Sequence, residues 1–231
     1  MTMTSLPDGF RALAIGASGG IGSAVLKLLE EDTRCSKVTG LSRSGTGLDV
    51  TNEESVAAAA AGLDGEYHLL FCATGALTID GVGPEKALKQ LSPKAMMRQF
   101  ALNALGPALL LKHFAPKLAR KERSLTAFLS ARVGSIGDNH LGGWISYRAS
   151  KAALNQIIRT AAIELARTHP QSVIAALHPG TVATDLTEDY SAGRERLHPE
   201  TSARMMLDVL DHLQPGQTGE FFAYDGKRVE W

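Results

Sequence analysis

Tyr147 and Lys151 are the two side chains in this sequence whose types and spacing best suit proton transfer. They stand at positions i and i+4, so a helix would place the phenol and the ammonium on one face. A phenol ionises near pH ~10, and a cation within a few ångströms favours its ionised form and brings it closer to a working acid or base. The pair could protonate a carbonyl oxygen during hydride transfer, although the same spacing also describes an ordinary exposed helix face.

A glycine-rich turn at residues 16–22 has the spacing of a dinucleotide-binding loop. It follows an apolar run at 11–15 and precedes a stretch at 21–31 with helical apolar spacing. Glycines allow the backbone to turn tightly and to approach a pyrophosphate, which the N–H groups of the helix would then bind. Such turns also occur without a nucleotide. We assign cofactor binding here to Gly16, Ser18, Gly20, Ile21 and Gly22.

The residues after the second predicted strand, 38–41, favour NADP over NAD. Ser42 and Arg43 stand where an acidic residue would bind an adenosine ribose, and the Arg43 guanidinium suits a 2′-phosphate instead. Arg43 could also be a solvated surface arginine. Asp49 could face the adenine or cap the helix predicted at 53–61.

The order of the predicted elements indicates a single-domain α/β fold over residues 1–231. Apolar strands at 11–15, 38–41, 68–73, 125–130, 173–177 and 221–224 alternate with helices at 21–31, 53–61, 93–118, 146–167 and 200–213. This alternation predicts a Rossmann-type, doubly wound parallel sheet with helices on both faces. No Pro/Ser-rich or charged stretch offers a linker.

Composition argues against several other classes of protein. The 24 basic and 24 acidic residues cancel, so no basic field for nucleic acid is expected. The apolar runs end far short of the ~20 residues that cross a bilayer. No signal peptide precedes Cys35 and Cys72, which favours the reducing cytoplasm. His113, His169 and His178 lack ligand spacing, so no metal site is predicted.

The chain resembles the short-chain dehydrogenase/reductase family along almost its whole length. The glycine turn, Asn103, the Tyr147/Lys151 pair and Pro179-Gly180 occur in that family's order and spacing. Within the family it is most similar to the C-factor and sniffer-like carbonyl reductases. That similarity rests on these segments: Val133-Gly-Ser-Ile136, Gly142-Gly-Trp144, Tyr147-Arg148, Tyr224-Asp-Gly and the final Trp231.

The resemblance implies a role for each matching residue. Tyr147 would be the acid/base, Lys151 would bind the nicotinamide ribose and lower the tyrosine pKa, and Asn103 would support a proton relay. Thr184 would bind the nicotinamide carboxamide. The other contacts it implies at this end of the cofactor come from Pro179, Gly180 and Val182.

Two departures from the family pattern affect the site. Cys72-Ala-Thr-Gly75 replaces the usual Asn-Asn-Ala-Gly, so cofactor contacts there would rely on backbone near Gly75. Ala131 occupies the position of the catalytic serine, and pleat alternation would send Ser130 to the opposite face from it. Ser135, twelve residues before Tyr147 in a turn past the strand, is the preferred substitute, with Ser130 as the alternative.

Pro107 has a steric consequence for Asn103. A helix opening at Ser92-Pro93 would run through Asn103, and the proline lacks the N–H that would bond the Asn103 carbonyl four residues earlier. That carbonyl would need another donor, such as an ordered water. The resemblance implies such a water between Asn103 and Lys151, whereas the alternative is a simple kink.

Together these features predict an enzyme, an NADP-dependent oxidoreductase acting on a small-molecule carbonyl or alcohol. The alternative is an NADP(H)-binding regulatory or signalling protein with little turnover. The polar segment 185–199 could close over the substrate or be an ordinary loop. By resemblance, the helices at 93–118 and 146–167 could pair in a homodimer or homotetramer.

Overall fold

Six parallel strands form one sheet, in the order β2-β1-β3-β4-β5-β6, in the computed structural model, which describes residues 2–190 and 195–231. Every predicted strand is present, with its ends shifted by at most three residues. The strands are β1 (Phe10–Ile15), β2 (Cys35–Leu41), β3 (Leu69–Cys72), β4 (Ser124–Leu129), β5 (Ser172–His178) and β6 (Phe221–Ala223).

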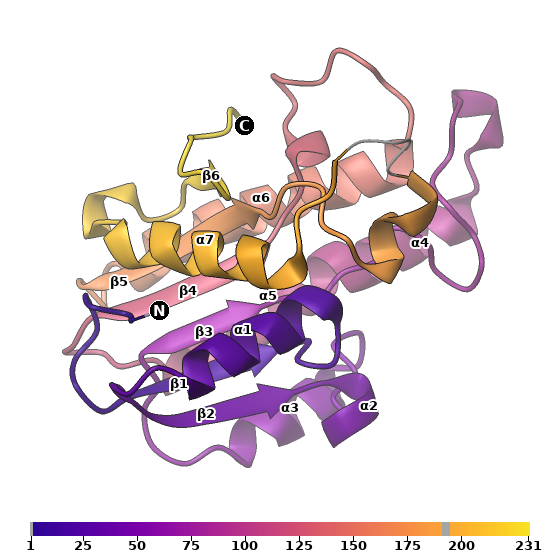
Figure 1. The fold of residues 1–231 in the computed structure, drawn as a ribbon. Helices are drawn as coiled ribbons and strands as arrows, with labels where there is room; N and C mark the ends of the chain where they lie inside the picture. The colour runs from indigo at the N-terminus through magenta and orange to yellow at the C-terminus, as the bar shows by residue number, and fades with distance from the viewer. Residues whose placement is uncertain (1, 191–194) are drawn as a thin grey trace.

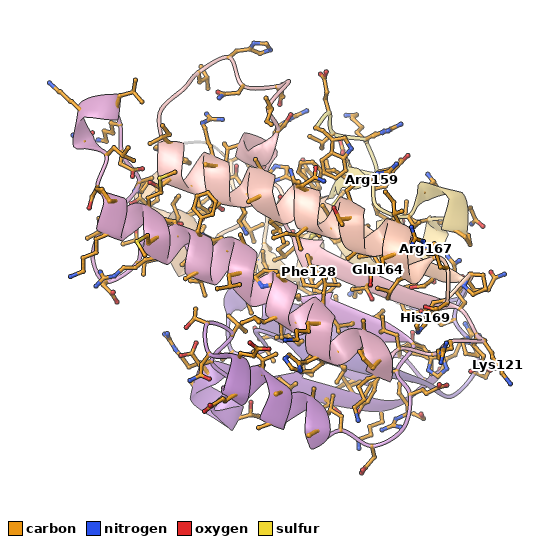
Figure 2. All side chains as sticks on the ribbon, turned by 180° about the vertical axis from the view of Figure 1, so that it is seen from behind. Lys121, Phe128, Arg159, Glu164, Arg167 and His169 are labelled. Carbon is orange, nitrogen blue, oxygen red and sulfur yellow. The ribbon has the colours of Figure 1, made fainter. Side chains whose placement is uncertain are left out.

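Helices cover both faces of the sheet, so the predicted doubly wound single domain is confirmed. The helices α1 and α7 lie side by side on one face (Figure 1), while α3, α4, α5 and α6 lie on the other (Figure 2). Their bounds are α1 (Gly20–Glu30), α2 (Arg43–Thr46), α3 (Glu53–Ala61), α4 (Pro93–Phe100), α5 (Gly106–Phe114), α6 (Ile145–Leu165) and α7 (Pro199–His212).

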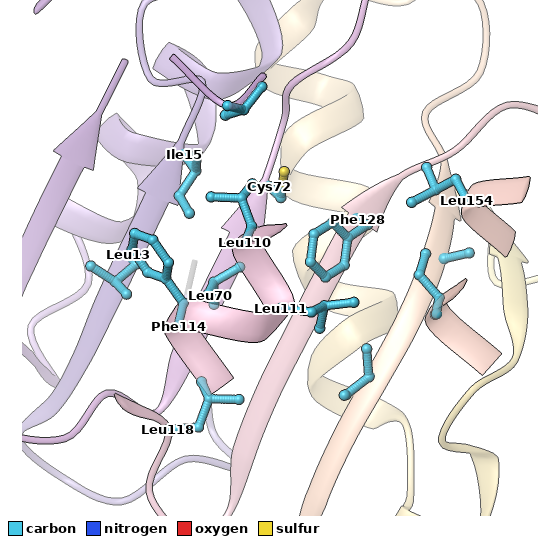
Figure 3. Packing of buried hydrophobic residues seen from close by; sticks show 14 of the residues in the cluster. Leu13, Ile15, Leu70, Cys72, Leu110, Leu111, Phe114, Leu118, Phe128 and Leu154 are labelled. Atoms are coloured by element: carbon cyan, nitrogen blue, oxygen red, sulfur yellow. The ribbon is translucent and has the colours of Figure 1, made fainter. Parts of the chain in front are cut away.

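Alternation along each strand divides the core into two layers. In β1, Leu13 and Ile15 point to the α5 and α6 face, where they pack with Phe114 and Phe128 (Figure 3), whereas Ala12 and Ala14 point to the α1 and α7 face. Burial of a large apolar side chain contributes about 1.5–3 kcal/mol. Burial on both faces explains why the strands read as continuous apolar runs.

The long helix predicted at 93–118 is one helical rod with a widened turn. Between α4 and α5, residues Ala101–Leu105 form a π-helix, in which the Gly106 N–H donates to the Ala101 carbonyl five residues earlier. Pro107 follows directly and has no N–H to give. The helix therefore does run through Asn103, which lies within the π-turn. Such turns are frequent at functional sites.

The chain reverses its winding direction at β1, which lies between β2 and β3. Ligands of doubly wound sheets bind where the strand order reverses, beyond the carboxyl ends of the strands. At that edge, Gly16 is the first residue after β1 and Gly75 is the third residue after β3. Within the described ranges, no helix is long and apolar enough to cross a membrane.

Candidate active site

Two glycines of the turn at residues 16–22 lie so close to neighbouring backbone that neither position has room for a side chain. Gly16 has φ +83°, and a Cβ there would lie 2.9 Å from the carbonyl carbon of Ala73. A Cβ on Gly22 would lie 2.0 Å from the Gly16 carbonyl oxygen. Gly19, the N-cap of α1, has no side chain to accept the N–H groups of the first turn. The result is a backbone cradle at a helix N-terminus, which fits a pyrophosphate.

The residues after β2 form a second polar corner. Ser42 is buried, and its hydroxyl accepts a hydrogen bond from the Gly45 N–H at 3.0 Å, which caps α2. Arg43 is the first residue of α2 and is exposed. The predicted contacts of Ser42 and Arg43 with a 2′-phosphate stay predictions, and the exposure of Arg43 leaves its guanidinium accessible.

Asp49 does not cap α3. The cap is Asn52, whose side chain accepts the Ser55 N–H at 3.1 Å, so the capping alternative for Asp49 is wrong. The Asp49 carboxylate accepts instead from the hydroxyl and N–H of Thr51, at 2.7 and 2.9 Å. These two bonds, helped by the nearby Arg43 charge, hold the pKa of Asp49 below its usual value.

The Asn103 side chain is fully buried and anchors the backbone that follows β3. Its Oδ1 accepts from the Ala76 N–H at 3.0 Å, and its Nδ2 donates to the Ala76 carbonyl at 3.0 Å and to Gln99 Oε1 at 2.6 Å. Gly75 has φ +144°, and a Cβ there would lie 3.0 Å from Asn103 Oδ1 and 3.1 Å from Lys151 Nζ. The structure therefore brings Gly75, Asn103 and Lys151 together.

Tyr147 and Lys151 are both buried near the start of α6. Lys151 Nζ donates to the Leu129 carbonyl at 2.9 Å and lies 5.8 Å from the centroid of the Tyr147 ring. Burial lowers the pKa of Lys151 to about 8, although the neighbouring Cys72 acts in the opposite direction.

Burial raises the pKa of Tyr147 above its ordinary value of 10.0. The expected lowering by Lys151 does not set the net direction in the chain alone, where desolvation of the phenolate dominates, and its role toward Tyr147 stays a prediction. Tyr147 is therefore protonated at neutral pH. A protonated phenol beside a buried ammonium is suited to donate a proton rather than to accept one.

The two candidate serines occupy different environments. The Ser130 hydroxyl donates to Asn155 Oδ1 of α6 at 2.6 Å, so pleat alternation does not separate Ser130 from the helix that carries Tyr147 and Lys151. Ser135 is also buried and accepts from the Asp138 N–H at 3.1 Å. As an acceptor in that bond, the Ser135 hydroxyl keeps its own proton to donate.

The loop after β5 lies beside the glycine turn. A Cβ on Gly20 would lie 2.6 Å from Thr184 Cγ2, so Thr184 lies at the N-terminus of α1. Gly180 has φ +80°, and Val182 is buried. Thr184 thus adjoins the cradle, and Pro179, Gly180 and Val182 belong to the same loop, so their contacts with a cofactor stay predictions. Further along, η5 (Asp185–Tyr190) forms a 3-10 helix, and residues 191–194 of the expected substrate segment lie outside the described residues.

Glu85 is a site residue that the sequence did not reveal. It is 8% exposed, and its carboxylate accepts from the Ser146 hydroxyl and from the Ser146 N–H, the latter at 3.2 Å. Burial opposes ionisation, but these hydrogen bonds outweigh it and hold the pKa of Glu85 below its usual value. A buried acid thus caps α6 one residue before Tyr147. Glu85 and Ser146 lie 61 positions apart, so no local pattern connects them.

Among the described residues, no three His, Cys, Asp or Glu side chains lie together as ligands of a metal ion would.

Comparisons with known proteins point to one family. A family model described as short chain dehydrogenase matches residues 11–195. The 1-hydroxy-2-glutathionyl-2-methyl-3-butene dehydrogenase of Rhodococcus sp. (strain AD45) is 34% identical over 188 residues, which cover 80% of this chain and 79% of that protein. The C-signal protein of Myxococcus xanthus is 37% identical over 147 residues, 63% of this chain and 84% of that protein.

Solved structures show the same fold. The NADPH-bound carbonyl reductase from chicken fatty liver has a TM-score of 0.79 at 26% identity, and the alignment covers 98% of this chain and 100% of the other. The Sniffer carbonyl reductase of D. melanogaster has a TM-score of 0.80 at 20% identity, covering 96% and 99% of the two chains. The similarity expected from the motifs is confirmed by these matches.

Proposed function

The chain belongs to the short-chain dehydrogenase family of oxidoreductases, and we propose that it transfers a hydride between NADP(H) and a small-molecule carbonyl or alcohol, with Tyr147 as the proton donor. The observation that carries this proposal is the buried group of Tyr147, Lys151 and Asn103, which Gly75 contacts beside the glycine cradle. A regulatory protein with little turnover would have no need of a buried phenol and ammonium together.

The contacts around the glycines support a cofactor site at this edge of the sheet. Side chains at Gly16, Gly22 or Gly75 would meet backbone or catalytic atoms, so these glycines let the chain pack closely between α1 and Lys151. Along this surface the α1 N–H groups would bind the pyrophosphate, Ser42 and Arg43 the 2′-phosphate, and Asp49 would face the adenine. Thr184 and its neighbours 179–182 would hold the nicotinamide end.

NADPH, when bound, supplies the hydride. In the reductive direction the carbonyl carbon gains that hydride, the C=O π pair moves to oxygen, and the oxygen takes the phenolic proton of Tyr147. The Lys151 ammonium offsets the negative charge left on the phenolate and binds the ribose. Oxidation of an alcohol is the same step reversed.

Resupply of the proton would pass through the Asn103 main chain. The Asn103 side chain is committed to Ala76 and Gln99, which leaves the carbonyl as its relay group. Pro107 withholds the N–H that an α-helix would place on this carbonyl. A high-resolution structure should show a water bridging the Asn103 carbonyl and Lys151, and a direct helical bond with no such water would overturn the relay.

Ser135 is proposed as the hydroxyl that supports the substrate oxygen. Its proton is free for donation, whereas the Ser130 hydroxyl is bound to Asn155. Ser135→Ala should therefore lower kcat more than Ser130→Ala. The reverse order would transfer the role to Ser130.

The function is tested by following the absorbance of NADPH with a panel of aldehydes and ketones. We expect turnover of at least one class of carbonyl, and a higher affinity for NADPH than for NADH. Arg43→Asp should weaken NADPH binding while leaving NADH binding nearly unchanged. Tight NADPH binding with no turnover of any carbonyl would favour the regulatory alternative. Equal affinity for NADPH and NADH would contradict the proposed binding of the 2′-phosphate by Arg43.

Assembly into a homodimer or homotetramer in the cytoplasm remains a further part of this proposal. Exposed apolar side chains support pairing through the α4, α5 and α6 face: Met97 is 73%, Leu105 51% and Ile163 50% exposed. Light scattering of the purified protein measures this directly, and a monomer at all concentrations would contradict it.

A further inference from the structure

Three consecutive residues before α6 adopt left-handed backbone conformations. Gly142, Gly143 and Trp144 have φ of +63°, +68° and +53°. For a tryptophan this conformation costs about 1–2 kcal/mol, and such strain persists only where neighbouring groups hold it. Arg148 Nε donates to the Gly142 and Gly143 carbonyls at 3.2 and 3.0 Å, and the Trp144 N–H donates to the Glu85 carbonyl at 2.5 Å.

In this conformation the Trp144 ring contacts two tyrosines. Its centroid lies 6.4 Å from that of Tyr147, with the planes at 70°, and 5.5 Å from that of Tyr190 in η5, with the planes at 78°. Both pairs have the edge-to-face geometry that aromatic rings prefer. The strained turn thus brings an indole to the ring of the proton donor.

Tyr190 is fixed from a third segment of the chain. Its hydroxyl lies 2.8 Å from Thr78 Oγ1, a hydrogen bond that spans 112 positions. A Cβ on Gly83 would lie 2.4 Å from the same hydroxyl, so Tyr190 packs directly over the Gly83 backbone. Trp144 and Tyr190 therefore form one wall, held by α6 at one end and by residues 78–83 at the other.

We propose that Trp144 and Tyr190 are specificity-determining residues that bind the organic group of the substrate and favour a flat, uncharged aromatic or conjugated carbonyl. This inference rests on the proposed function. A proton donor must lie within hydrogen-bond distance of the substrate oxygen, so the group on the carbonyl carbon lies within a few ångströms of Tyr147. Trp144 is the aromatic neighbour of Tyr147 on the side of η5.

The chemistry of the wall supports a neutral, flat ligand. Trp144, Tyr190 and Thr78 carry no charge, the Arg148 Nε is taken by backbone carbonyls, and the Glu85 carboxylate is bound to Ser146. Stacking or edge contact with an aromatic ring contributes about 0.5–1.5 kcal/mol beyond burial of area, which corresponds to about a two- to tenfold preference per ring.

The test compares acetophenone with cyclohexyl methyl ketone, which share a carbon skeleton but differ in the flatness of the ring. The ratio of kcat/KM for the two ketones should favour acetophenone in the wild type. Trp144→Leu and Tyr190→Leu should each lower that ratio by about two- to tenfold, mainly through KM, while the NADPH Kd stays unchanged. Tyr190→Phe, which keeps the ring and removes the bond to Thr78, should retain more of the ratio than Tyr190→Leu.

A binding measurement separates failure of this inference from failure of the proposed function. In a Trp231→Phe background Trp144 is the remaining tryptophan. Saturable quenching of its fluorescence by acetophenone, and not by the cyclohexyl ketone, would support the wall even if turnover were absent. No difference between the ketones in either quenching or kcat/KM, with circular dichroism showing folded variants, would overturn the inference while an active enzyme left the function intact.

Discussion

The two sides of the site are built in opposite ways. The proposed cofactor cradle consists of backbone, and its tightest approach joins Gly22 to Gly16 within one turn of the chain. The proposed substrate side consists of side chains that meet across the sequence, with Glu85 on Ser146 and Thr78 on Tyr190. One side is therefore specified by local spacing, and the other by packing of distant segments.

This difference predicts how each side responds to change. Adding a single methyl group at Gly16 or Gly22 would drive it into the neighbouring backbone, which cannot move aside as a side chain can. On the substrate side, a substitution removes one contact among several. We therefore expect moderate changes in KM for the carbonyl substrate and little change in the NADPH Kd. Four substitutions test this contrast, in order of decreasing expected effect.

Tyr147→Phe should have the largest effect, on turnover alone. The variant keeps the buried ring and removes the proton that the raised pKa holds on the phenol. We expect kcat to fall by about 10²–10⁴-fold, with the NADPH Kd within about twofold of the wild type. Stopped-flow turnover and cofactor fluorescence measure the two. Retention of a tenth or more of kcat would assign the proton to another group.

Gly22→Ala should damage the cradle. The new Cβ would lie 2.0 Å from the Gly16 carbonyl oxygen, so the turn must shift, at a cost of about 1–3 kcal/mol in the free energy of unfolding, with loss of NADPH binding. Gly216→Ala is the matched control, because a Cβ there meets nothing within 4 Å. Urea unfolding and NADPH titration of both variants give the comparison. Equal NADPH affinity of the two would contradict a backbone cradle.

Much of the cradle and the fold was predictable from the sequence, for a physical reason. Strands buried on both faces must be apolar throughout, and the glycines at 16, 20 and 22 lie within a single strand-turn-helix unit, so short windows carry the signal. The Tyr147/Lys151 pair was equally readable, because one helix sets its spacing.

The rest depended on contacts that no short window contains. The role of Glu85 needs the loop 77–91 folded against α6, and Trp144 needs a left-handed turn that its residue type disfavours. The net direction of the Tyr147 pKa shift was not readable from the sequence for the same reason. Spacing indicated the nearby cation, whereas the direction of the shift depends on how deeply the tertiary structure buries the phenol.

Lys151→Met should abolish most turnover and raise stability. Burial lowers the pKa of Lys151 from its ordinary 10.5 to about 8, which at about 1.4 kcal/mol per pH unit makes the buried ammonium cost about 3 kcal/mol. The variant also loses the hydrogen bond from Lys151 to the Leu129 carbonyl, which lowers the free energy of unfolding by about 1 kcal/mol and offsets part of the gain. The free energy of unfolding at pH 7 should therefore rise by about 2 kcal/mol.

The pH dependence of this gain has a definite sign. Because the folded pKa is lowered, the unfolded chain binds more protons between pH 8 and 10.5, so wild-type stability from this group rises with pH across that window. The advantage of Lys151→Met should shrink there, and wild-type kcat should fall as pH rises through about 8. Thermal unfolding between pH 6 and 10 measures the first effect. A variant less stable than the wild type at pH 7 would refute the assigned cost.

Glu85→Gln should have the smallest effect, and it distinguishes the two sides of the site most cleanly. The carboxylate accepts both the hydroxyl and the N–H of Ser146 at the positive end of α6, and an amide oxygen replaces it without charge. Loss of such a cap costs about 0.5–2 kcal/mol. Because Glu85 also fixes Trp144 through its carbonyl, a shifted loop should raise KM for the carbonyl substrate and leave the NADPH Kd unchanged.

The matched control is Glu54→Gln, since Glu54 is an exposed acid in the first turn of α3. Its cost should be below about 0.5 kcal/mol. The lowered pKa of Glu85 means that its stabilisation is present above its unfolded pKa near 4.5 and is lost as pH falls through the lower folded pKa. The difference between wild type and Glu85→Gln should therefore be constant near neutral pH and disappear in acid. If Glu85→Gln weakened NADPH binding as much as it raised KM, the two sides would be one cooperative unit, and the contrast between backbone cradle and side-chain wall would fail.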